Sequence, residues 1–324
     1  MRRSIATVGA WVVTAGMLAF LFWRTPLSQV VEATRAAATW TVPAALFWVA
    51  AIYLADSFAI WKTFGWFLAK LSFAQVLVVR GATYLLAAIN YSVGQGAIVY
   101  FVHRATGVPV LRGVGTVLLI MGINVLALLA LATVGLAIAP DVPRGLAIVV
   151  AGAFVGLLVY ALGVAVKPRW LARRPIFDVL LGAGLGGHLR ALAVRLPHIA
   201  TLVGLQMSML HAFGVKVPLV DAVVTLPIVF FVAVLPISVQ GIGTTQAAMV
   251  LFFARFAPGD RGAQEAAVLA ASLVSQAIAL TFQITVGLLC LRSSVGRDLR
   301  KATRAAATPA AAPAGSFDDT TRDR

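Results

Sequence analysis

Residues 218–253 read PLVDAVVTLPIVFFVAVLPISVQGIGTTQAAMVLFF, an apolar run interrupted by the polar, glycine-rich string LPISVQGIGTT (235–245). A second interruption, NYSVGQG (90–96), lies inside the apolar run 81–103. Glycine and proline break helices, and a membrane tolerates the freed backbone groups only where protein or a water-filled cavity satisfies them. The two interrupted runs are therefore predicted to enter the membrane and turn back.

The composition of the whole chain excludes a soluble globular protein. Of its 324 residues, 61% are hydrophobic and 11% are charged, with a mean hydropathy of +0.96, whereas soluble domains carry about 25% charged residues. Residues 1–291 are predicted to form an all-α integral membrane domain, a polytopic helical bundle of about eight hydrophobic segments of membrane-spanning length. The predicted segments are 5–23, 41–61, 81–103, 113–139, 146–166, 198–214, 218–253 and 264–291.

The remaining residues, 292–324, begin with basic side chains and continue as an Ala/Pro-rich run. Such a composition buries too little apolar surface to order itself, so we expect a disordered cytoplasmic tail. The first apolar segment lacks a small-residue cleavage site and is expected to be a retained transmembrane helix rather than a signal peptide.

The formal net charge is +15, which in a soluble protein would suggest nucleic acid. In a membrane protein the same excess reflects the positive-inside rule and anionic lipid headgroups, so the expected partner is membrane lipid and not nucleic acid. The single cysteine, Cys290, excludes a disulfide framework. The four histidines lack metal-ligand spacing, and no metal or cofactor is predicted.

The distribution of Lys and Arg predicts the topology. If the runs 81–103 and 218–253 return to the side they enter from, most basic residues, including those of the stretch 167–195, fall on the same side as both termini. If every run crosses once, most of the Lys and Arg residues fall on the outer side instead. The positive-inside rule favours the first arrangement, in a cell membrane with the N-terminus and the tail in the cytoplasm.

In this topology the two interrupted runs enter from opposite sides. Broken segments at corresponding positions of two halves are the sequence sign of an inverted-repeat transporter with its site near the midplane. The short similarity between SVGQG (92–96) and SVQGIG (238–243) agrees with an inverted repeat.

The string PISVQGIGTTQAAMVLFF (236–253) resembles the signature of the integral-membrane region of lysylphosphatidylglycerol synthases and their stand-alone, flippase-like relatives. That signature is Pro-Ile-Ser-x-x-Gly-x-Gly-x-x-acid-Ala. Gln246 stands where the family has an acid. An earlier family motif keeps its asparagine and glycines but lacks its proline and acid. The positions that match the two motifs are Pro236, Ile237, Ser238, Gly241, Gly243 and Ala247, then Asn90, Gly94 and Gly96.

The resemblance covers roughly residues 5–292 and implies translocation of a lipid headgroup across the bilayer. It does not imply the aminoacyl-transferase reaction, which belongs to a separate soluble domain that residues 292–324 are too few to contain.

Two clusters are predicted to bind the substrate. In the second interrupted run, Thr244 or Thr245 is expected to cap a half-helix whose free N–H groups face an anionic group. The alternatives are a tight turn between two ordinary helices and, for the first cluster, plain interhelical hydrogen bonds. The candidates are Asn90, Tyr91, Ser92, Gly94, Gln95 and Gly96 in the first run, and Pro236, Ser238, Gln240, Gly241, Gly243, Thr244, Thr245 and Gln246 in the second.

Asp56 and Arg80 complete the predicted site. Arg80 flanks the first interrupted run on the cytoplasmic side, where we expect it either to attract headgroups or to be a plain positive-inside anchor. Asp56 lies inside an apolar run, a position that costs about 2.5–3.5 kcal/mol on insertion scales, so Lys62 or Arg80 is expected to pair with it. Asp56 is alternatively part of a proton or substrate path, or a solvated residue near the cytoplasmic end. Isolated polar side chains such as Asn124 are interpreted as interhelical contacts.

The predicted function is a flippase-like lipid translocase that moves an anionic phospholipid or a polyprenyl-phosphate-linked headgroup. No GxxxxGK[ST] loop is present, so ATP hydrolysis is not expected to drive it. The alternatives are a secondary transporter of a small solute and, less favoured, a membrane-embedded glycosyltransferase. The expectation is thus that the chain is not an enzyme.

Overall fold

The computed structural model describes residues 2–89, 91–138, 144–234 and 238–293, and this part of the chain contains helices and no strand. Five of the helices contain stretches long and apolar enough to cross a membrane. They are α3 (Thr41–Phe67), α6 (Val110–Ile138), α7 (Arg144–Val166), α9 (Pro175–Ala212) and α12 (Arg261–Arg292). The predicted all-α, polytopic membrane fold is confirmed. Asn90, Pro236 and the predicted tail from residue 294 lie outside the described residues.

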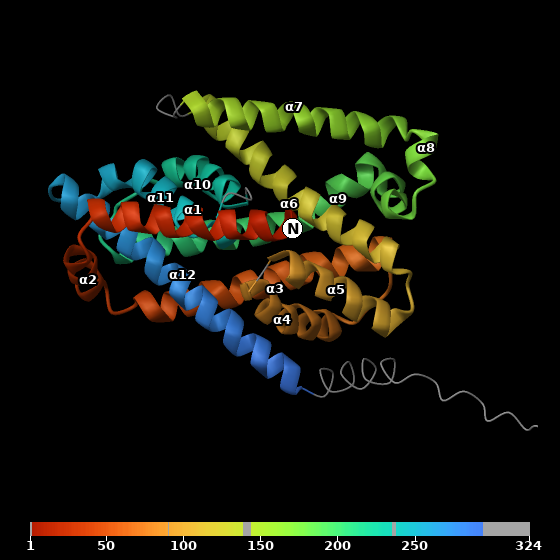
Figure 1. Ribbon diagram of the computed structural model, residues 1–324, viewed down its shortest axis with the longest axis horizontal. Helices are drawn as coiled ribbons and strands as arrows, with labels where there is room; N and C mark the ends of the chain where they lie inside the picture. Colours follow the sequence, from red (N-terminus) through yellow and green to blue (C-terminus); the bar gives the residue numbers. More distant parts are fainter. Residues whose placement is uncertain (1, 90, 139–143, 235–237, 294–324) are drawn as a thin grey trace, which may run out of the picture.

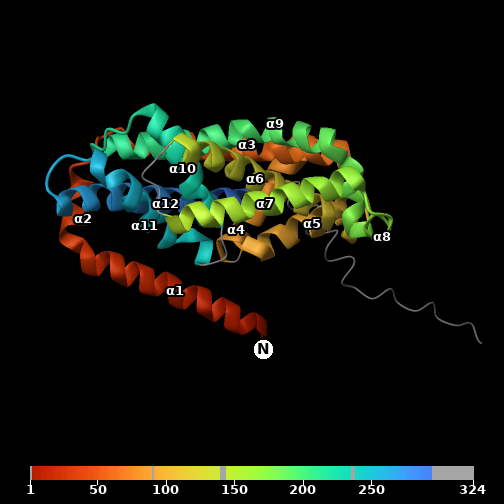
Figure 2. The same ribbon diagram turned by 90° about the horizontal axis from the view of Figure 1, so that it is seen from above.

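The remaining helices complete the fold (Figure 1). They are α1 (Arg2–Arg24), α2 (Leu27–Arg35), α4 (Phe73–Ile89), α5 (Tyr91–Thr106), α8 (Arg169–Ala172), α10 (Leu219–Val234) and α11 (Thr244–Phe253), with 3₁₀ turns at Val239–Gly241 and Ala254–Phe256. Figure 2 shows that α1 diverges from the rest of the bundle along its length.

The first interrupted run forms a hairpin of α4 and α5. A Cβ placed on Gly94 would lie 2.8 Å from the backbone Cα of Ala87, so the two helices touch next to their connection. Val76 and Val102, near the other ends of these helices, line one small cavity and therefore also lie close together. The two helices have 17 and 16 residues, fewer than the roughly 20 that a spanning helix needs. Both ends of this hairpin therefore lie at the same end of the bundle, the arrangement on which the predicted re-entry depends.

The second interrupted run forms a hairpin of α10 and α11. The backbone N–H of Lys216 donates to the carbonyl of Phe256 over 3.2 Å, which joins the open ends of the hairpin. A Cβ on Gly241 would lie 3.1 Å from the Cα of Ala233, so the chain also closes tightly at the other end. α11 has 10 residues, about 15 Å of helix, which is half of the hydrocarbon thickness.

The two hairpins occupy equivalent places in two similar units. The first unit is α3, the α4–α5 hairpin and α6; the second is α9, the α10–α11 hairpin and α12. The units are interleaved, because α4 packs on α12 and α10 packs on α6. The backbone bond from Ala38 to Ala212 places the start of α3 beside the end of α9, so the two leading helices are antiparallel. This arrangement is an inverted repeat, as the broken segments predict.

The bundle has two ends, which we name by their charge (Figure 1). The basic end contains residues 67–73, 106–112 and 166–178, and an Arg112–Asp178 ion pair of 3.3 Å joins two of these segments. The opposite end contains residues 24–41, 212–218 and 254–262. Arg24 there forms an ion pair of 3.0 Å with Glu265 in the second turn of α12. The α4–α5 hairpin opens at the basic end and the α10–α11 hairpin opens at the opposite end.

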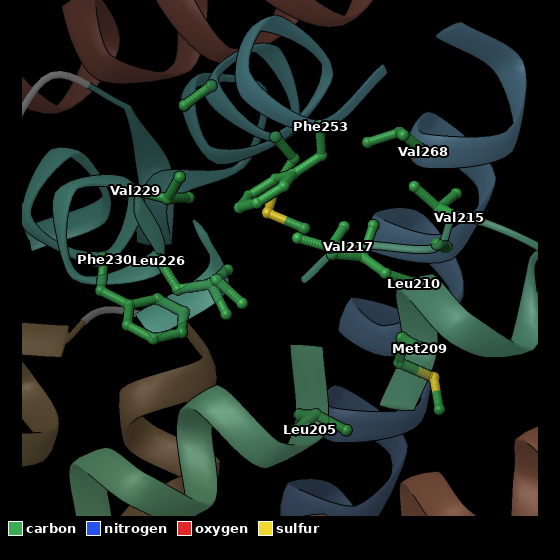
Figure 3. Close-up of a cluster of buried hydrophobic side chains, with 14 of the residues drawn as sticks. Leu205, Met209, Leu210, Val215, Val217, Leu226, Val229, Phe230, Phe253 and Val268 are labelled. Carbon is green, nitrogen blue, oxygen red and sulfur yellow. The ribbon is translucent and has the colours of Figure 1, made fainter. Parts of the chain in front are cut away.

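A dense apolar core holds the second hairpin in the bundle. Figure 3 shows side chains of α9, α10, α11 and α12 meeting with the segment 215–217. Leu210, Leu226, Met249 and Phe253 are fully buried there. In lipid, apolar side chains gain no transfer free energy from water on packing together, so van der Waals contacts hold this core. The hairpin is therefore packed as tightly as the core of a soluble domain.

The stretch 167–195 differs from its predicted role as a basic loop. α9 already begins at Pro175, and its backbone departs from helical geometry at Gly184, where φ is +61°. Arg195 consequently lies in the middle of a helix and is buried. The prediction of a loop was wrong because it followed the many basic residues of this stretch. The helical spacing of the apolar residues continues between them.

Candidate functional site

A buried ion cluster lies halfway along the bundle. Asp56 is 1% exposed on α3. Its Oδ2 accepts a hydrogen bond from Nε of Arg80 on α4 at 2.5 Å, and its Oδ1 accepts one from Nη1 of Arg195 on α9. One carboxylate therefore bridges two guanidinium groups that come from different units of the repeat.

Further contacts orient both guanidinium groups. Nε of Arg195 donates to Oδ1 of Asn124 on α6 at 3.0 Å. The guanidinium carbon of Arg80 lies 4.7 Å from the ring centroid of Tyr84, one turn along α4, a cation–π contact. Because charged hydrogen bonds are roughly twice as strong as neutral ones and directional, these contacts hold the two cations in defined positions.

The cluster lines a small polar cavity. Its wall comes from α3, α4, α5, α6 and α9, and Gln95 of α5 is half-buried in it. The cavity volume is about 20 Å³, which is room for a water molecule. The lining residues are Asp56, Ile60, Arg80, Gln95, Ile120, Met121, Asn124 and Arg195.

The charges of the cluster do not cancel. Two guanidinium groups remain protonated at any physiological pH, and Asp56, held between them, is the one carboxylate among the lining residues. The net charge of the cavity wall is therefore +1. A buried positive excess surrounded by amides attracts an anion, and guanidinium groups match the geometry of phosphate oxygens.

The second predicted cluster is internally hydrogen-bonded. The N–H of Gly243 donates to Oε1 of Gln246 at 2.7 Å, the Ser238 and Thr244 hydroxyls lie 2.9 Å apart, and the Thr244 hydroxyl donates to the Gly241 carbonyl at 3.1 Å. The residue that caps α11 is Gly243, not the predicted Thr244 or Thr245, since its φ of +87° suits glycine alone. The Gly243 N–H and the Thr244 hydroxyl are thus bonded within the hairpin instead of facing a ligand.

α1 covers this part of the second hairpin. The N–H of Val239 donates to Oγ1 of Thr14 at 2.9 Å, and a Cβ on Gly243 would lie 2.7 Å from Cβ of Met17. Gln246 is 1% exposed. These contacts give the glycine string a structural role at the α1 interface.

The structure brings together Asp56, Arg80 and Gln95 from the predicted set. Gly94 packs against α4 beside them, and Gly96 faces open space. The second-hairpin residues do not line the cavity of the first hairpin. The side chains of Tyr91, Ser92 and Gln240, like Asn90 and Pro236, are outside what the structure describes.

Three polar residues of this region were not predicted as site residues. The sequence predicts Arg195 in a basic loop and Asn124 in a plain interhelical contact. It predicts no role for His198, one turn after Arg195. A signal was present, because ALAVRLPHIATLV (191–203) is an apolar run containing an arginine and a histidine three residues apart. Ionisable residues within such a run face the interior and have partners.

Comparison with known protein families identifies the fold. Residues 7–287 match the family model described as "Lysylphosphatidylglycerol synthase TM region". The chain belongs to this family. Among curated proteins no significant match is found.

The match to the lysylphosphatidylglycerol synthase TM region family spans both units of the inverted repeat, including both hairpins and all members of the ion cluster. The resemblance stated from the motif at 236–253 is confirmed. The family description indicates a role connected with membrane lipid. Lipids with phosphate headgroups therefore surround the protein that contains the buried cluster.

Proposed function

We propose that this chain is a flippase-like lipid translocase, not an enzyme, that moves an anionic phospholipid or a polyprenyl-phosphate-linked lipid across the cell membrane. The cargo's phosphate engages Arg80 and Arg195 halfway across, while its acyl chains remain in the bilayer. The partner is thus membrane lipid rather than nucleic acid.

The observation that carries this proposal is the net positive, buried cluster of Asp56, Arg80 and Arg195. An isolated charge in the hydrocarbon core is costly, so a headgroup crosses only where fixed partners replace its water. Two guanidinium groups that share a single carboxylate provide such partners. A guanidinium group carries five N–H donors, more than its hydrogen bond to Asp56 uses.

Loading requires the cluster to open. A cavity of about 20 Å³ holds a water molecule but no phosphate group. The element placed to move is the α4–α5 hairpin, because it carries Arg80 and Gln95 and is shorter than a spanning helix. Its separation from α3 and α9 exposes both guanidinium groups to an entering headgroup.

The charge asymmetry supports an orientation with the basic end in the cytoplasm. The basic end and the first turns beside it carry more Lys and Arg than the opposite end, as the positive-inside rule requires of a cytoplasmic surface. These residues are Lys62, Lys70, Arg104, Arg112, Lys167, Arg169, Arg173, Arg174 and Arg190.

The test is exchange of fluorescent lipid between the leaflets of proteoliposomes. Wild-type protein should accelerate exchange of labelled phosphatidylglycerol above empty liposomes. Arg195→Lys keeps the charge but cannot contact Asn124 and Asp56 together, and should lower the rate by about tenfold or more, since hydrogen bonds to charged groups contribute about 1.5–3 kcal/mol. The control Arg35→Lys, on the exposed surface of α2, should exchange lipid like wild type.

Two results would overturn the proposal. Exchange equal to empty liposomes for phosphatidylglycerol, cardiolipin and a polyprenyl phosphate would remove lipid as the cargo. Thermal stabilisation by a soluble phosphate compound, with none by short-chain lipids, would favour the small-solute transporter instead.

A further inference from the structure

His198 is a buried histidine beside the ion cluster that the proposed function does not use. It lies three residues after Arg195 on α9 and is 8% exposed. Its Nδ1 is buried and has no hydrogen-bond partner within the described part of the chain. A buried polar atom without a partner destabilises the folded state, and such exceptions call for an explanation.

The ring is held by the helix it packs against. It hydrogen-bonds to the backbone of Ile52 on α3, one turn before Asp56. In a neutral imidazole one nitrogen carries a proton and the other a lone pair. Because the nitrogen that bonds the Ile52 carbonyl carries the proton, Nδ1 carries the lone pair and is able to accept a second proton.

The charges around His198 belong to the same cluster. They are Asp56 from α3, Arg80 from α4 and Arg195 from α9, while α6 contributes the neutral amide of Asn124. Two cations and one anion leave one positive charge, which disfavours a further positive charge on the ring. An arriving phosphodiester brings one negative charge and cancels that excess, so the same ring then gains a proton at lower cost.

We propose that His198 accepts a proton at Nδ1 when an anionic phosphate binds Arg80 and Arg195, so that lipid anion and proton cross the membrane together. The inference rests on the proposed function. Hydronium in the water on the loading side gives up the proton: its O–H bond breaks as the N–H bond forms with the Nδ1 lone pair, which leaves a neutral water molecule. When the headgroup leaves, the N–H bond breaks and the proton returns to water as hydronium. No other bond changes.

Electroneutrality is the physical advantage of this coupling. Moving one net charge across a membrane potential costs or releases about 2.3 kcal/mol per 100 mV. A phosphodiester and a proton together carry no net charge, so their joint passage is independent of the potential. A pH gradient, on the other hand, drives the lipid toward the side with fewer protons.

The direct test is NMR of protein labelled at its histidine rings, of which the chain has four. Adding dihexanoyl-phosphatidylglycerol should convert one imidazole from the neutral to the protonated spectrum, and that signal should be missing in His198→Gln. If that variant does not fold, His103→Gln, His188→Gln and His211→Gln identify the remaining signal by elimination. Lipid binding that leaves the His198 ring neutral would overturn the inference.

A parallel titration with inorganic phosphate distinguishes the source of the anion. Protonation by the lipid alone supports the inference for a lipid cargo. Protonation by inorganic phosphate alone keeps the role of His198 but contradicts lipid translocation. If neither of these probes binds, and cardiolipin and a polyprenyl phosphate do not bind either, the proposed function itself is defeated. That result differs from binding without protonation, which overturns the role of His198 alone.

Proteoliposomes containing a pH indicator supply the transport measurement. With wild-type protein, about one proton should move per phosphatidylglycerol transferred, a charge-neutral pairing, and an imposed pH gradient should drive lipid to one leaflet. The matched control His211→Gln, an exposed histidine at the opposite end of α9, should show the same ratio. Lipid exchange by wild type without proton movement would refute the coupling and leave the translocase proposal intact.

Discussion

Asp56 on α3 and Arg195 on α9 form a buried ion pair, although 139 residues separate them in the chain. The pair joins the leading helices of the two units of the inverted repeat, and Arg80 adds the first hairpin to it. A single carboxylate thus connects three elements at the level where a headgroup would cross.

Replacing this carboxylate should destabilise the protein. Asp56→Asn leaves the Arg80 and Arg195 charges buried without their anion, and breaking a buried pair costs about 3–5 kcal/mol. The measurement is thermal unfolding in detergent. Asp178→Asn is the control, because Asp178 is 53% exposed and pairs with the equally accessible Arg112, so it should cost under about 1 kcal/mol. Equal losses in the two variants would contradict the buried location.

Two glycines of α5 provide a matched steric test of the first hairpin. A Cβ on Gly94 would lie 2.6 Å from Cβ of Ala87, whereas one on Gly96 would meet nothing within 4 Å. Gly94→Ala should therefore force α4 and α5 apart and cost about 1–3 kcal/mol. Gly96→Ala should be neutral or stabilise by up to about 1 kcal/mol, because alanine is the better helix former. Unfolding curves in detergent measure both, and the reverse order would refute the hairpin contact.

The capping contact of the second hairpin can be tested at Gln246. Gln246→Leu removes the acceptor of the buried Gly243 N–H and should cost about 1–3 kcal/mol. Gln246→Glu, which introduces the acid expected from the family signature, keeps an acceptor and should lose less stability than the leucine variant. Gln264→Leu on the exposed start of α12 is the control. A leucine variant as stable as wild type would show that this hydrogen bond has no structural importance.

The proposed orientation predicts a labelling pattern in intact cells. In a Cys290→Ala background, cysteines at exposed positions Lys216 and Pro258 should both react with an impermeant maleimide, because they share the opposite end. A cysteine at Ala105, at the basic end, should react only after the membrane is opened. Reaction of the first two positions from different sides would exclude a second hairpin that returns to its side of entry.

Much of the architecture was predictable from short-range patterns. The apolar runs and the glycine breaks at 90–96 and 235–245 identified most of the membrane helices and both hairpins, because lipid leaves few ways to satisfy a backbone. The first half of α9, from Pro175, was missed. The sequence alone left open whether Asp56 pairs with Arg80 or with Lys62. The structure decides for Arg80, while Nζ of Lys62 lies 4.4 Å from the ring centroid of Trp61.

The local sequence patterns by themselves determined that this protein is a helical membrane bundle with two broken segments, because hydropathy and helix breaking act over a few residues. Only the tertiary structure decided that Arg195, Asn124 and His198 join Asp56. Nothing local marks these residues as neighbours, because the packing of α3 against α6 and α9 depends on side chains far apart in the chain. The same packing decided that the polar groups of the second hairpin bond one another, since a buried donor takes the nearest acceptor that folding brings to it.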